Sequence, residues 1–303
     1  MKLKLTYIYH SGFAIQAPGV TILIDYWQDS AKGRGGERVT LEIAPREGVR
    51  VIGSSEEGAG EGWVKRWLEE APAGEAFYVL SSHFHADHFN PEVLSWRAKR
   101  PEIHYILSAD IAKHRRAPRS AATFIHKGES YSDGRLTVKA FGSTDVGVSF
   151  LLTLDGVTIF HAGDLNNWHW KDESTPEEVR KAEGDFLAEL RDIRREVEAV
   201  DVAFFPVDNR MGSDYMRGAR QFVEAIRVGL FVPMHYDEER AAAAAFQAIA
   251  QANGAGVWPP PAPLKGGGPN LRETRPLRLL PPLREAGGGD QPFETPVSYV
   301  SPL

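Results

Sequence analysis

Four short apolar segments of the chain each lead into a histidine or an aspartate. The segments are residues 77–80, 157–160, 202–206 and 230–234, and the side chains that follow them are His83, Asp164, Asp208 and His235. Short, continuous apolar segments are typical of strands that are buried on both faces, as in a parallel sheet. Ligand sites of such sheets lie beyond the carboxyl ends of the strands. The pattern therefore predicts an α/β fold in which these polar side chains meet at one edge of a sheet.

Helical patterns alternate with the strands. At residues 175–178, Thr-Pro-Glu-Glu combines an N-cap threonine, a proline at the first helical position and a glutamate three residues after the cap. Apolar residues from Val179 to Val197 then recur at spacings of three and four, which predicts one helix face packed on the core. Further helices are predicted over residues 63–70, over residues 221–228, and from an Asp237 cap to Asn253. The alternation is typical of a layered α/β domain.

Additional strands are predicted over residues 3–9, 20–25, 49–52, 103–107, 136–141 and 148–154. The pair Asp155-Gly156 is a strong signal for a tight hairpin turn. Residues 29–62 are rich in Gly, Glu and Arg and are interpreted as a partly irregular insertion. Eleven of the twenty prolines fall in the last 49 residues. We therefore expect one domain over residues 1–254, followed by a Pro/Gly-rich tail over residues 255–303.

The absence of cysteine excludes disulfide bonds, thiolate metal ligands and a cysteine nucleophile. The formal net charge of -6 counts against nucleic acid or an anionic membrane as a partner. The one basic stretch, residues 114–119, is interpreted as a solvated loop. The first residues alternate like a strand, and no segment approaches ~18 consecutive apolar residues. We therefore expect a cytoplasmic protein without a membrane segment.

The densest group of chemically capable side chains is Ser82-His83-Phe84-His85-Ala86-Asp87-His88. Three histidines and one aspartate form an H-x-H-x-D-H pattern directly after an apolar strand. Imidazole nitrogen and carboxylate oxygen are the metal ligands open to a chain without cysteine. We expect the side chains that follow the later strands, Asp164, Asp208 and His235, to complete the same set of metal ligands.

The H-x-H-x-D-H pattern, followed by a strand with Gly163-Asp164 and by a late Pro233-Met234-His235, resembles the metallo-β-lactamase superfamily. The resemblance extends from about Tyr9 to Tyr236. It implies a four-layer αβ/βα sandwich, in which two sheets pack face to face with helices outside. It also implies that His83 and His85 bind a first metal, that Asp87, His88 and His235 bind a second metal, and that Asp164 bridges both.

One position departs from the family pattern. The family usually supplies a third histidine to the first metal, and Ser143 stands at its place. A serine hydroxyl is a poor zinc ligand. Asp145 could supply an oxygen instead, or the first site could be weak or empty. We expect one or two Zn²⁺ ions, and a shell with fewer nitrogens would make Mn²⁺ or Fe²⁺ more competitive.

The expected chemistry is hydrolysis. A bound divalent ion lowers the pKa of its water from about 15.7 to about 7, and the resulting hydroxide attacks a carbonyl carbon or phosphorus. Asp87 is the candidate that orients this nucleophile or accepts its proton. His169 is the candidate acid for the leaving group, with a purely structural role in its loop as the alternative.

Other residues near the expected sheet edge have two interpretations each. His10, with Asp25 and Tyr26, is a candidate for the pocket beside the metal, and His10 could also be a ligand. His161 is a candidate for orienting a ligand from behind, and it could also be a metal ligand or line the pocket.

A second group of residues follows the apolar segments 157–160 and 202–206 in the sequence, and is therefore expected near the same site. Asp208 and Arg210 could bind an anionic substrate, but an ordinary ion pair is favoured. Trp168 and Trp170 could line a substrate wall or anchor their loop in the core. The remaining histidines without a motif, interpreted as surface or structural residues, are His104, His114 and His126.

Three functions remain open. The first is a hydrolase for a small-molecule ester, lactone or phosphoester. The second is an RNA- or DNA-processing nuclease of the same superfamily, against which the acidic balance and the lack of an extended basic arm count. The third is a metal-binding protein whose catalysis has decayed, as the missing third histidine would allow. Association into a homo-oligomer is compatible with the sequence.

Overall fold

The computed structural model describes residues 1–29, 35–44, 48–59, 63–70, 74–236 and 239–258. Within these residues the chain forms two mixed sheets. The first sheet has the strand order β5-β4-β1-β2-β3-β6-β7-β8. Its strands are β1 (Lys2–Tyr9), β2 (Gly12–Ala17), β3 (Val20–Ile24), β4 (Gly35–Ala44), β5 (Gly48–Ala59), β6 (Ala76–Ser81), β7 (His104–Ser108) and β8 (Thr123–Ile125).

The second sheet has the strand order β15-β14-β13-β12-β11-β10-β9. Its strands are β9 (Ser130–Ser132), β10 (Leu136–Phe141), β11 (Ser149–Leu154), β12 (Val157–His161), β13 (Ala199–Pro206), β14 (Arg227–Met234) and β15 (Gly256–Val257). Strands β12, β13 and β14 are parallel to one another. In the first sheet, β3, β6, β7 and β8 are also parallel. The carboxyl ends of each parallel set therefore share one sheet edge.

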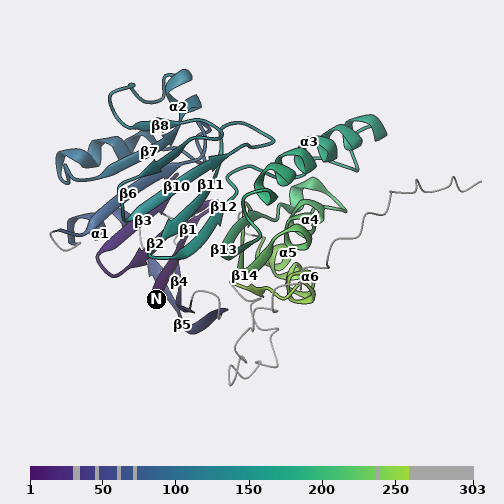
Figure 1. The fold of residues 1–303 in the computed structure, drawn as a ribbon, viewed down its shortest axis with the longest axis horizontal. Coiled ribbons are helices and arrows are strands. Elements are labelled where there is room, and N and C mark those ends of the chain that lie inside the picture. Colours follow the sequence, from purple (N-terminus) through teal and green to yellow (C-terminus); the bar gives the residue numbers. More distant parts are fainter. Residues whose placement is uncertain (30–34, 45–47, 60–62, 71–73, 237–238, 259–303) are drawn as a thin grey trace, which may run out of the picture.

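Helices cover the outer face of each sheet, which gives the four layers that the family resemblance implies (Figure 1). On the first sheet lie α1 (Trp63–Glu70), the 3₁₀-helix η1 (Pro91–Ala98) and α2 (Ala109–Lys113). On the second sheet lie α3 (Pro176–Arg194), α4 (Arg217–Ala225), α5 (Arg240–Ala245) and α6 (Gln247–Ala252), with a short 3₁₀-helix η2 (Asn209–Met211) after β13.

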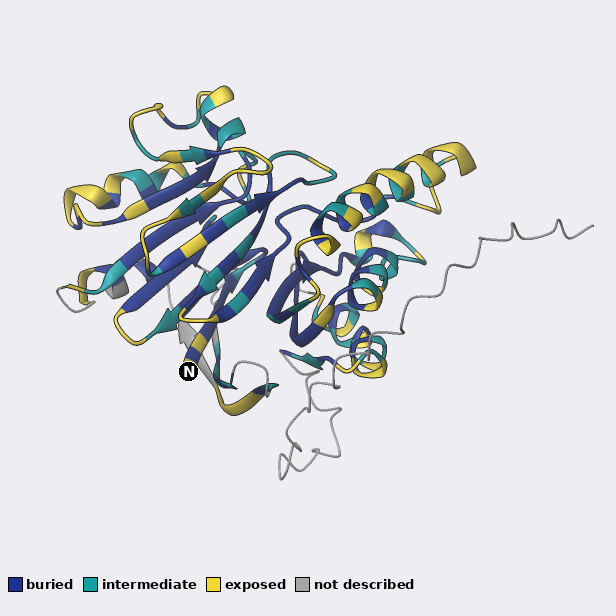
Figure 2. Cartoon of the chain, viewed as in Figure 1, coloured by how far each residue is buried: buried dark blue, intermediate teal, exposed yellow. Residues whose placement is uncertain are grey.

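Strand β6 shows why the apolar segments are continuous. Its residues point alternately to the two faces of the sheet. Phe77 and Val79 pack under the outer helices, whereas Tyr78 and Leu80 belong to the core that includes both sheets. Both faces are covered, so both kinds of position are apolar, and the strands are buried over most of their length (Figure 2).

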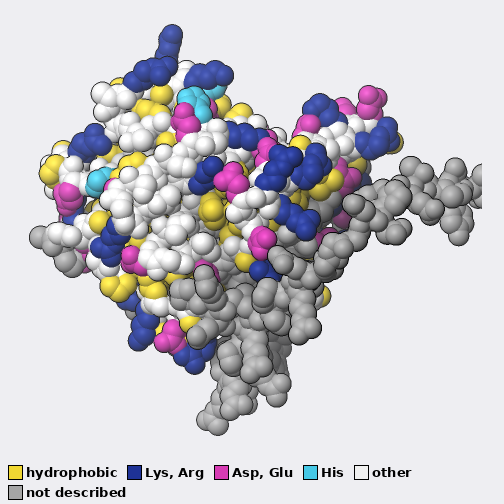
Figure 3. Space-filling model, in the orientation of Figure 1, with side chains coloured by type: hydrophobic (Ala, Val, Ile, Leu, Met, Phe, Trp, Pro, Cys, Tyr) yellow, Lys and Arg dark blue, Asp and Glu magenta, His cyan; other side chains and the backbone are white. Residues whose placement is uncertain are grey.

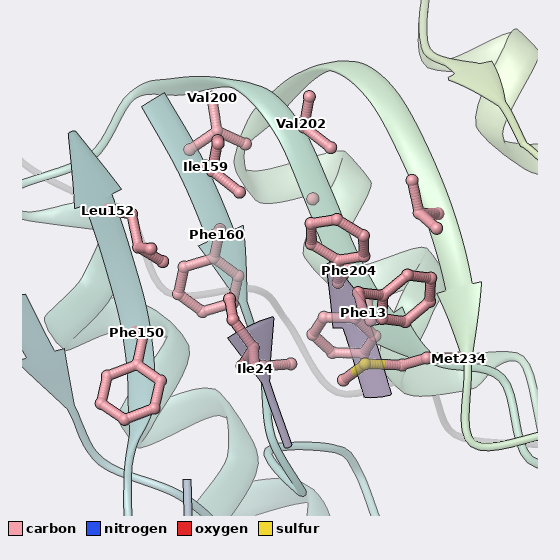
Figure 4. Packing of buried hydrophobic residues seen from close by; sticks show 14 of the residues in the cluster. Phe13, Ile24, Phe150, Leu152, Ile159, Phe160, Val200, Val202, Phe204 and Met234 are labelled. Atoms are coloured by element: carbon pink, nitrogen blue, oxygen red, sulfur yellow. The ribbon is translucent and has the colours of Figure 1, made fainter. Parts of the chain in front are cut away.

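The large core lies between the two sheets and continues under the helices of the second sheet. Figure 4 shows Phe13 of the first sheet against Phe204 of the second, with Phe160 and Met234 close by. The rings of Phe13 and Phe204 lie 4.4 Å apart between centroids. This packing fixes the two sheets relative to each other, and hence the two sheet edges that carry the polar side chains.

Several predicted elements agree with the structure. The capping box at Thr175 is present and starts α3, and the hairpin turn at Asp155-Gly156 joins β11 to β12. The apolar stripe of α3 is buried only in its second half, at Phe186, Leu190 and Ile193, and the outer side of the helix is exposed (Figure 2).

Other predictions need correction. Residues 29–62, predicted as partly irregular with a strand at 49–52, contain more regular structure than expected, because β4 and β5 form a long hairpin that pairs with β1 through β4. Helix α4 covers residues 217–225 rather than 221–228, and Gly229 lies inside β14 instead of ending the helix. Strand β2 was not predicted, because Ser11-Gly12-Phe13 resembles a turn.

The expected tail begins with ordered structure. Residues 256–257 form β15 beside β14, and Trp258 is buried in the large core. The rest of that segment, residues 259–303, and the Asp237 cap lie outside the described residues. The predicted final helix is divided at Phe246 into α5 and α6. Within the described residues, none of the helices combines the length and the apolar character that spanning a membrane requires.

Candidate metal centre

The loop after β6 brings its histidines to the carboxyl edge of the first sheet, where side chains from β12, β14 and two further loops meet them. Two groups of metal-binding residue types result, and within each group one ligand atom per residue lies within 4.8 Å of all the others. The first cluster is His83, His85, Asp145 and Asp164. The second cluster is His10, Asp87, His88 and His235.

The first cluster has two nitrogen and two oxygen donors. Nε2 of His83 lies 3.1 Å from Nδ1 of His85 and 3.5 Å from Oδ2 of Asp164. Nδ1 of His85 lies 3.3 Å from Oδ2 of Asp145. Asp145 thus lies close enough to His83 and His85 to supply an oxygen to the same ion. Ser143 is in the turn before it, and its hydroxyl accepts a hydrogen bond from the Asp145 amide.

The second cluster is richer in nitrogen. Nε2 of His10 lies 3.4 Å from Oδ2 of Asp87, and the rings of His10 and His235 lie 4.1 Å apart. Oδ1 of Asp164 lies 3.1 Å from Nε2 of His88 and 3.5 Å from Nε2 of His235. Since Oδ2 of Asp164 faces His83, this one carboxylate lies between the two clusters.

Two buried carboxylates orient the histidines of the second cluster. Oδ2 of Asp25 lies 2.8 Å from Nδ1 of His88, and Asp25 also accepts hydrogen bonds from the amide and the hydroxyl of Ser82. Oδ2 of Asp208 lies 2.9 Å from Nδ1 of His235. With Nδ1 engaged, each histidine directs Nε2 toward Asp164. A carboxylate behind a histidine ligand fixes the tautomer and the ring orientation.

The carboxylates of the centre favour positive charge on two of its histidines. Burial disfavours charge on His235, but the carboxylate of Asp164 outweighs it and raises the pKa of His235 to about 9. The same balance raises the pKa of His88 well above its usual value. Burial opposes ionisation of Asp164, but the charges of His88 and His235 outweigh it and lower its pKa. Protons thus supply the positive charge that the carboxylates require.

His83 differs from these two histidines. Burial, with His88 nearby, lowers the pKa of His83 to about 3, so this ring is a neutral nitrogen donor. Burial raises the pKa of Asp145, and Asp164 adds to that shift.

Two buried polar atoms of the centre that have no hydrogen-bond partner also indicate a metal site. Among the described residues, Nε2 of His88 and Oδ1 of Asp164 are buried without a hydrogen-bond partner, although the two atoms lie 3.1 Å apart. Unpaired buried polar atoms are costly. A cation between them satisfies both.

The loop that carries Asp145 is held close to the histidine loop. The amide of Val148 donates to the carbonyl of Ser82 over 2.9 Å. Gly147 has φ +74°, and a Cβ at this position would overlap the Ser82 carbonyl oxygen and the backbone of His83. Only glycine allows this close approach.

His161 and His169 are buried and belong to neither cluster. His161 accepts a hydrogen bond from the Gly163 amide at Nδ1, which is 3.9 Å from Asp25, and its Nε2–H donates to the Ser11 carbonyl. It therefore packs behind Asp25. Nδ1–H of His169 donates to the Asn167 carbonyl, and its Nε2 lies 3.8 Å from Asp214. The ring of His169 thus faces the 208–214 loop.

Asp25 and Asp208 have more specific positions than the sequence indicated. Asp25 was a candidate for the pocket, and the Asp208–Arg210 pair was expected to be an ordinary ion pair. The pair is present, with a distance of 2.6 Å, but Asp208 also holds His235. The sequence carries the same signal for both positions, because each residue is an acid that follows an apolar strand.

Comparisons with known proteins agree with this arrangement. The family described as "Beta-lactamase superfamily domain" matches residues 4–179. No protein with a curated description matches the chain significantly.

Solved structures share the fold at low sequence identity. Igni18, a metallo hydrolase from the archaeon Ignicoccus hospitalis, is 18% identical with a TM-score of 0.54, over 87% of this chain and 97% of that one. A protein described as a metal-dependent hydrolase from Parabacteroides distasonis is 14% identical with a TM-score of 0.52, over 84% and 91% of the two chains. CmlA, a diiron β-hydroxylase from Streptomyces venezuelae, is 14% identical with a TM-score of 0.52, over 84% and 52%.

Proposed function

Because the chain belongs to the metallo-β-lactamase superfamily, we propose that it is a metal-dependent hydrolase of a small ester, lactone or phosphoester. The observation that carries the proposal is the position of Asp164 between two clusters of histidine and aspartate side chains that could each hold a metal ion. A divalent ion held there supplies a Lewis acid and lowers the pKa of water to about 7.

The residues of the two clusters have different proposed roles. His83, His85, Asp145 and Asp164 would hold one ion, and Asp87, His88, His235 and Asp164 a second, with His10 beside it. The Asp87 side chain is 37% exposed, so it can reach both water and substrate. Burial opposes its ionisation, but His10 and His88 outweigh burial and lower its pKa, so the carboxylate is ionised and can orient the nucleophile by accepting a hydrogen bond from it.

The donor set bears on which metal is bound. Two oxygens in the first cluster make Mn²⁺ or Fe²⁺ more competitive there, whereas the second cluster has the nitrogen donors that suit Zn²⁺. We propose that Asp145 replaces the usual histidine as a ligand rather than leaving the first site empty.

The test compares metal content, activity and stability. Protein loaded with Zn²⁺, Mn²⁺ or Fe²⁺ is expected to carry about two ions and to hydrolyse a simple ester, a lactone or bis-p-nitrophenyl phosphate, with activity abolished by a chelator. In Asp87→Asn, kcat is expected to fall by roughly 10²–10⁴-fold with little change in melting temperature. Asp185→Asn, an exposed carboxylate on α3, is the matched control. Unchanged kcat in Asp87→Asn would refute the mechanism, and two bound metals without turnover across the panel would indicate a decayed enzyme.

A second candidate function has one observation in its favour. The carboxylate of Asp145 in the first cluster, together with the structural similarity to a diiron β-hydroxylase, favours oxygen chemistry on two iron ions. Oxygen consumption by the iron-loaded protein with a reductant, but not by the zinc-loaded protein, would support it. The face shown in Figure 3 does not favour a nuclease function, because basic and acidic side chains are interspersed on it rather than gathered into a basic patch.

A further inference from the structure

Aromatic side chains that are outside the core gather beside the second cluster. Tyr9, Trp27, Trp168 and Trp170 are half-buried, and we call these four residues the aromatic rim. In the part of the chain that the structure describes, they belong to neither hydrophobic core. Trp96 and Trp258, by contrast, are buried in those cores. Large apolar rings that do not pack in a core leave surface in contact with water, which costs free energy.

The rings of the aromatic rim and of the metal-binding histidines form one continuous series of contacts. The centroid distances are 6.5 Å for Trp170–Trp168, 5.4 Å for Trp168–His235, 4.1 Å for His235–His10, 6.0 Å for His10–Trp27 and 5.3 Å for Trp27–Tyr9. Trp27 and Trp168 therefore border the second cluster from two loops that are far apart in the sequence.

Both loops hold their tryptophans in place. The indole N–H of Trp168 donates to the carbonyl of Asp164 over 2.7 Å, which ties the ring to the residue between the two clusters. The carbonyl of Trp27 accepts a hydrogen bond of 2.8 Å from the Asn90 amide. Trp170 has φ +40°, an unfavourable backbone conformation for a residue with a side chain. The Trp168 ring, held by its indole N–H, can bind a ligand without a large cost in side-chain entropy.

Ligand sites combine apolar and aromatic walls with a few fixed polar groups. The second cluster has both, since the aromatic rim contacts His10 and His235, and His10 lies 3.4 Å from the partly exposed carboxylate of Asp87. We infer, on the premise that this centre is the proposed hydrolase site, that the aromatic rim binds a flat apolar group of the substrate. The substrate class is then an ester, lactone or phosphoester with an aromatic or similarly flat group beside the bond that is cleaved.

The experiment measures binding rather than turnover. Dissociation constants of 2-naphthoate and acetate for the metal-loaded protein are determined by calorimetry. Both probes are monocarboxylates, so the ratio of their affinities isolates the aromatic group. We expect 2-naphthoate to bind at least about tenfold more tightly, and Trp27→Ala and Trp168→Ala each to reduce this ratio by roughly three- to tenfold. Phenylalanine at either position should restore most of the ratio.

The control variant is Ile52→Ala, which removes an exposed apolar side chain from the edge strand β5. It should leave the affinity ratio unchanged. A ratio near one in the unsubstituted protein, or a ratio that survives in both alanine variants, would overturn the inference. Acetate binding in each variant reports whether the metal site is intact, so a misfolded variant is recognised.

The same measurements separate this inference from the proposed function. If 2-naphthoate binding depends on the aromatic rim but the metal-loaded protein cleaves none of the esters, the rim is a ligand site and the hydrolase proposal fails. If Asp87→Asn abolishes ester hydrolysis but the aromatic rim does not affect the affinity ratio, the hydrolase proposal holds and this inference fails.

Discussion

His88 and His235 each have a carboxylate at both ring nitrogens. Asp164 lies at Nε2 of both rings, while Asp25 and Asp208 lie at the two Nδ1 atoms. Such a ring is held in one orientation, and it binds either a proton or a metal ion. The outer carboxylates, Asp25 and Asp208, are therefore as much part of the centre as the proposed ligands.

The proposed role of Asp145 as a ligand distinguishes this centre from the family pattern, in which a histidine stands at the position of Ser143. Its side chain is 40% exposed beside His85, so a larger imidazole has room at the same position. Restoring a third nitrogen to the first cluster should make it more selective for Zn²⁺ over Mn²⁺.

This difference can be tested with Asp145→His. We expect the ratio of Zn²⁺ to Mn²⁺ affinity at the weaker of the two sites to rise by roughly tenfold or more, measured by competition titration. Asp145→Asn, which keeps the size but removes the charge, should lose affinity for both ions. If Asp145→His leaves the metal preference as it was, Asp145 is not a ligand.

At the scale of secondary structure, strands position the centre and short loops complete it. Strand β6 delivers the histidine loop, β14 delivers His235, and the turn between β1 and β2 delivers His10. The β10–β11 loop reaches the histidine loop only because Gly147 packs directly against it. The position of Asp145 thus depends on a glycine two residues away.

Gly147→Ala should therefore act on one metal site rather than on the whole fold. The new methyl group would push residues 142–148 away from Ser82, and we expect loss of the ion at the first cluster and a destabilisation of about 1–3 kcal/mol. Metal content and thermal melting measure the two effects.

Gly156 provides the matched control. It also has a positive φ, of +84°, but a Cβ there meets nothing within 4 Å. Gly156→Ala should cost about 1 kcal/mol in backbone strain and leave both metals bound. Equal metal loss in both variants would show that strain, and not the close contact with Ser82, governs the site.

At the scale of the whole molecule, the centre joins the two sheets. His10 and the 83–88 loop come from the first sheet, whereas Asp145, Asp164 and His235 come from the second. Bound metal therefore adds to the attraction that the core between the sheets supplies, and its removal should change global stability.

The effect of metal removal should depend on pH. In metal-free protein, the pKa of His235 is raised from 6.5 to about 9, so its protonation favours the folded state. This contribution is fully present below pH 6.5 and is lost as pH rises through 9. In metal-loaded protein the ion replaces the proton, so binding becomes tighter as pH rises.

Calorimetric melting between pH 6.5 and 9.5 measures this contrast. The melting temperature of the chelator-treated protein should fall across the range, while that of the metal-loaded protein should not. His235→Gln should weaken the pH dependence of the metal-free protein. A metal-free protein that is equally stable at pH 6.5 and 9.5 would show that Asp164 and Asp208 do not favour protonation of His235.

The sequence by itself determined the elements that depend on near neighbours. The cap at Thr175, the turn at Asp155-Gly156 and the buried strand before His83 were all predicted, because capping, turn geometry and burial on both faces leave local patterns. The H-x-H-x-D-H pattern likewise indicated a metal centre and its family.

Tertiary structure alone decided how distant residues combine. His10 lies beside His235, and Asp25 holds His88, because the order of the strands in each sheet and the packing of one sheet on the other bring these positions together. No local pattern records such contacts, since they depend on the path of the chain between the residues. The β4–β5 hairpin is different, because β4 does show a local pattern: the buried residues Val39, Leu41 and Ile43 alternate with polar residues, and only the pairing of this hairpin with β1 depends on the tertiary structure.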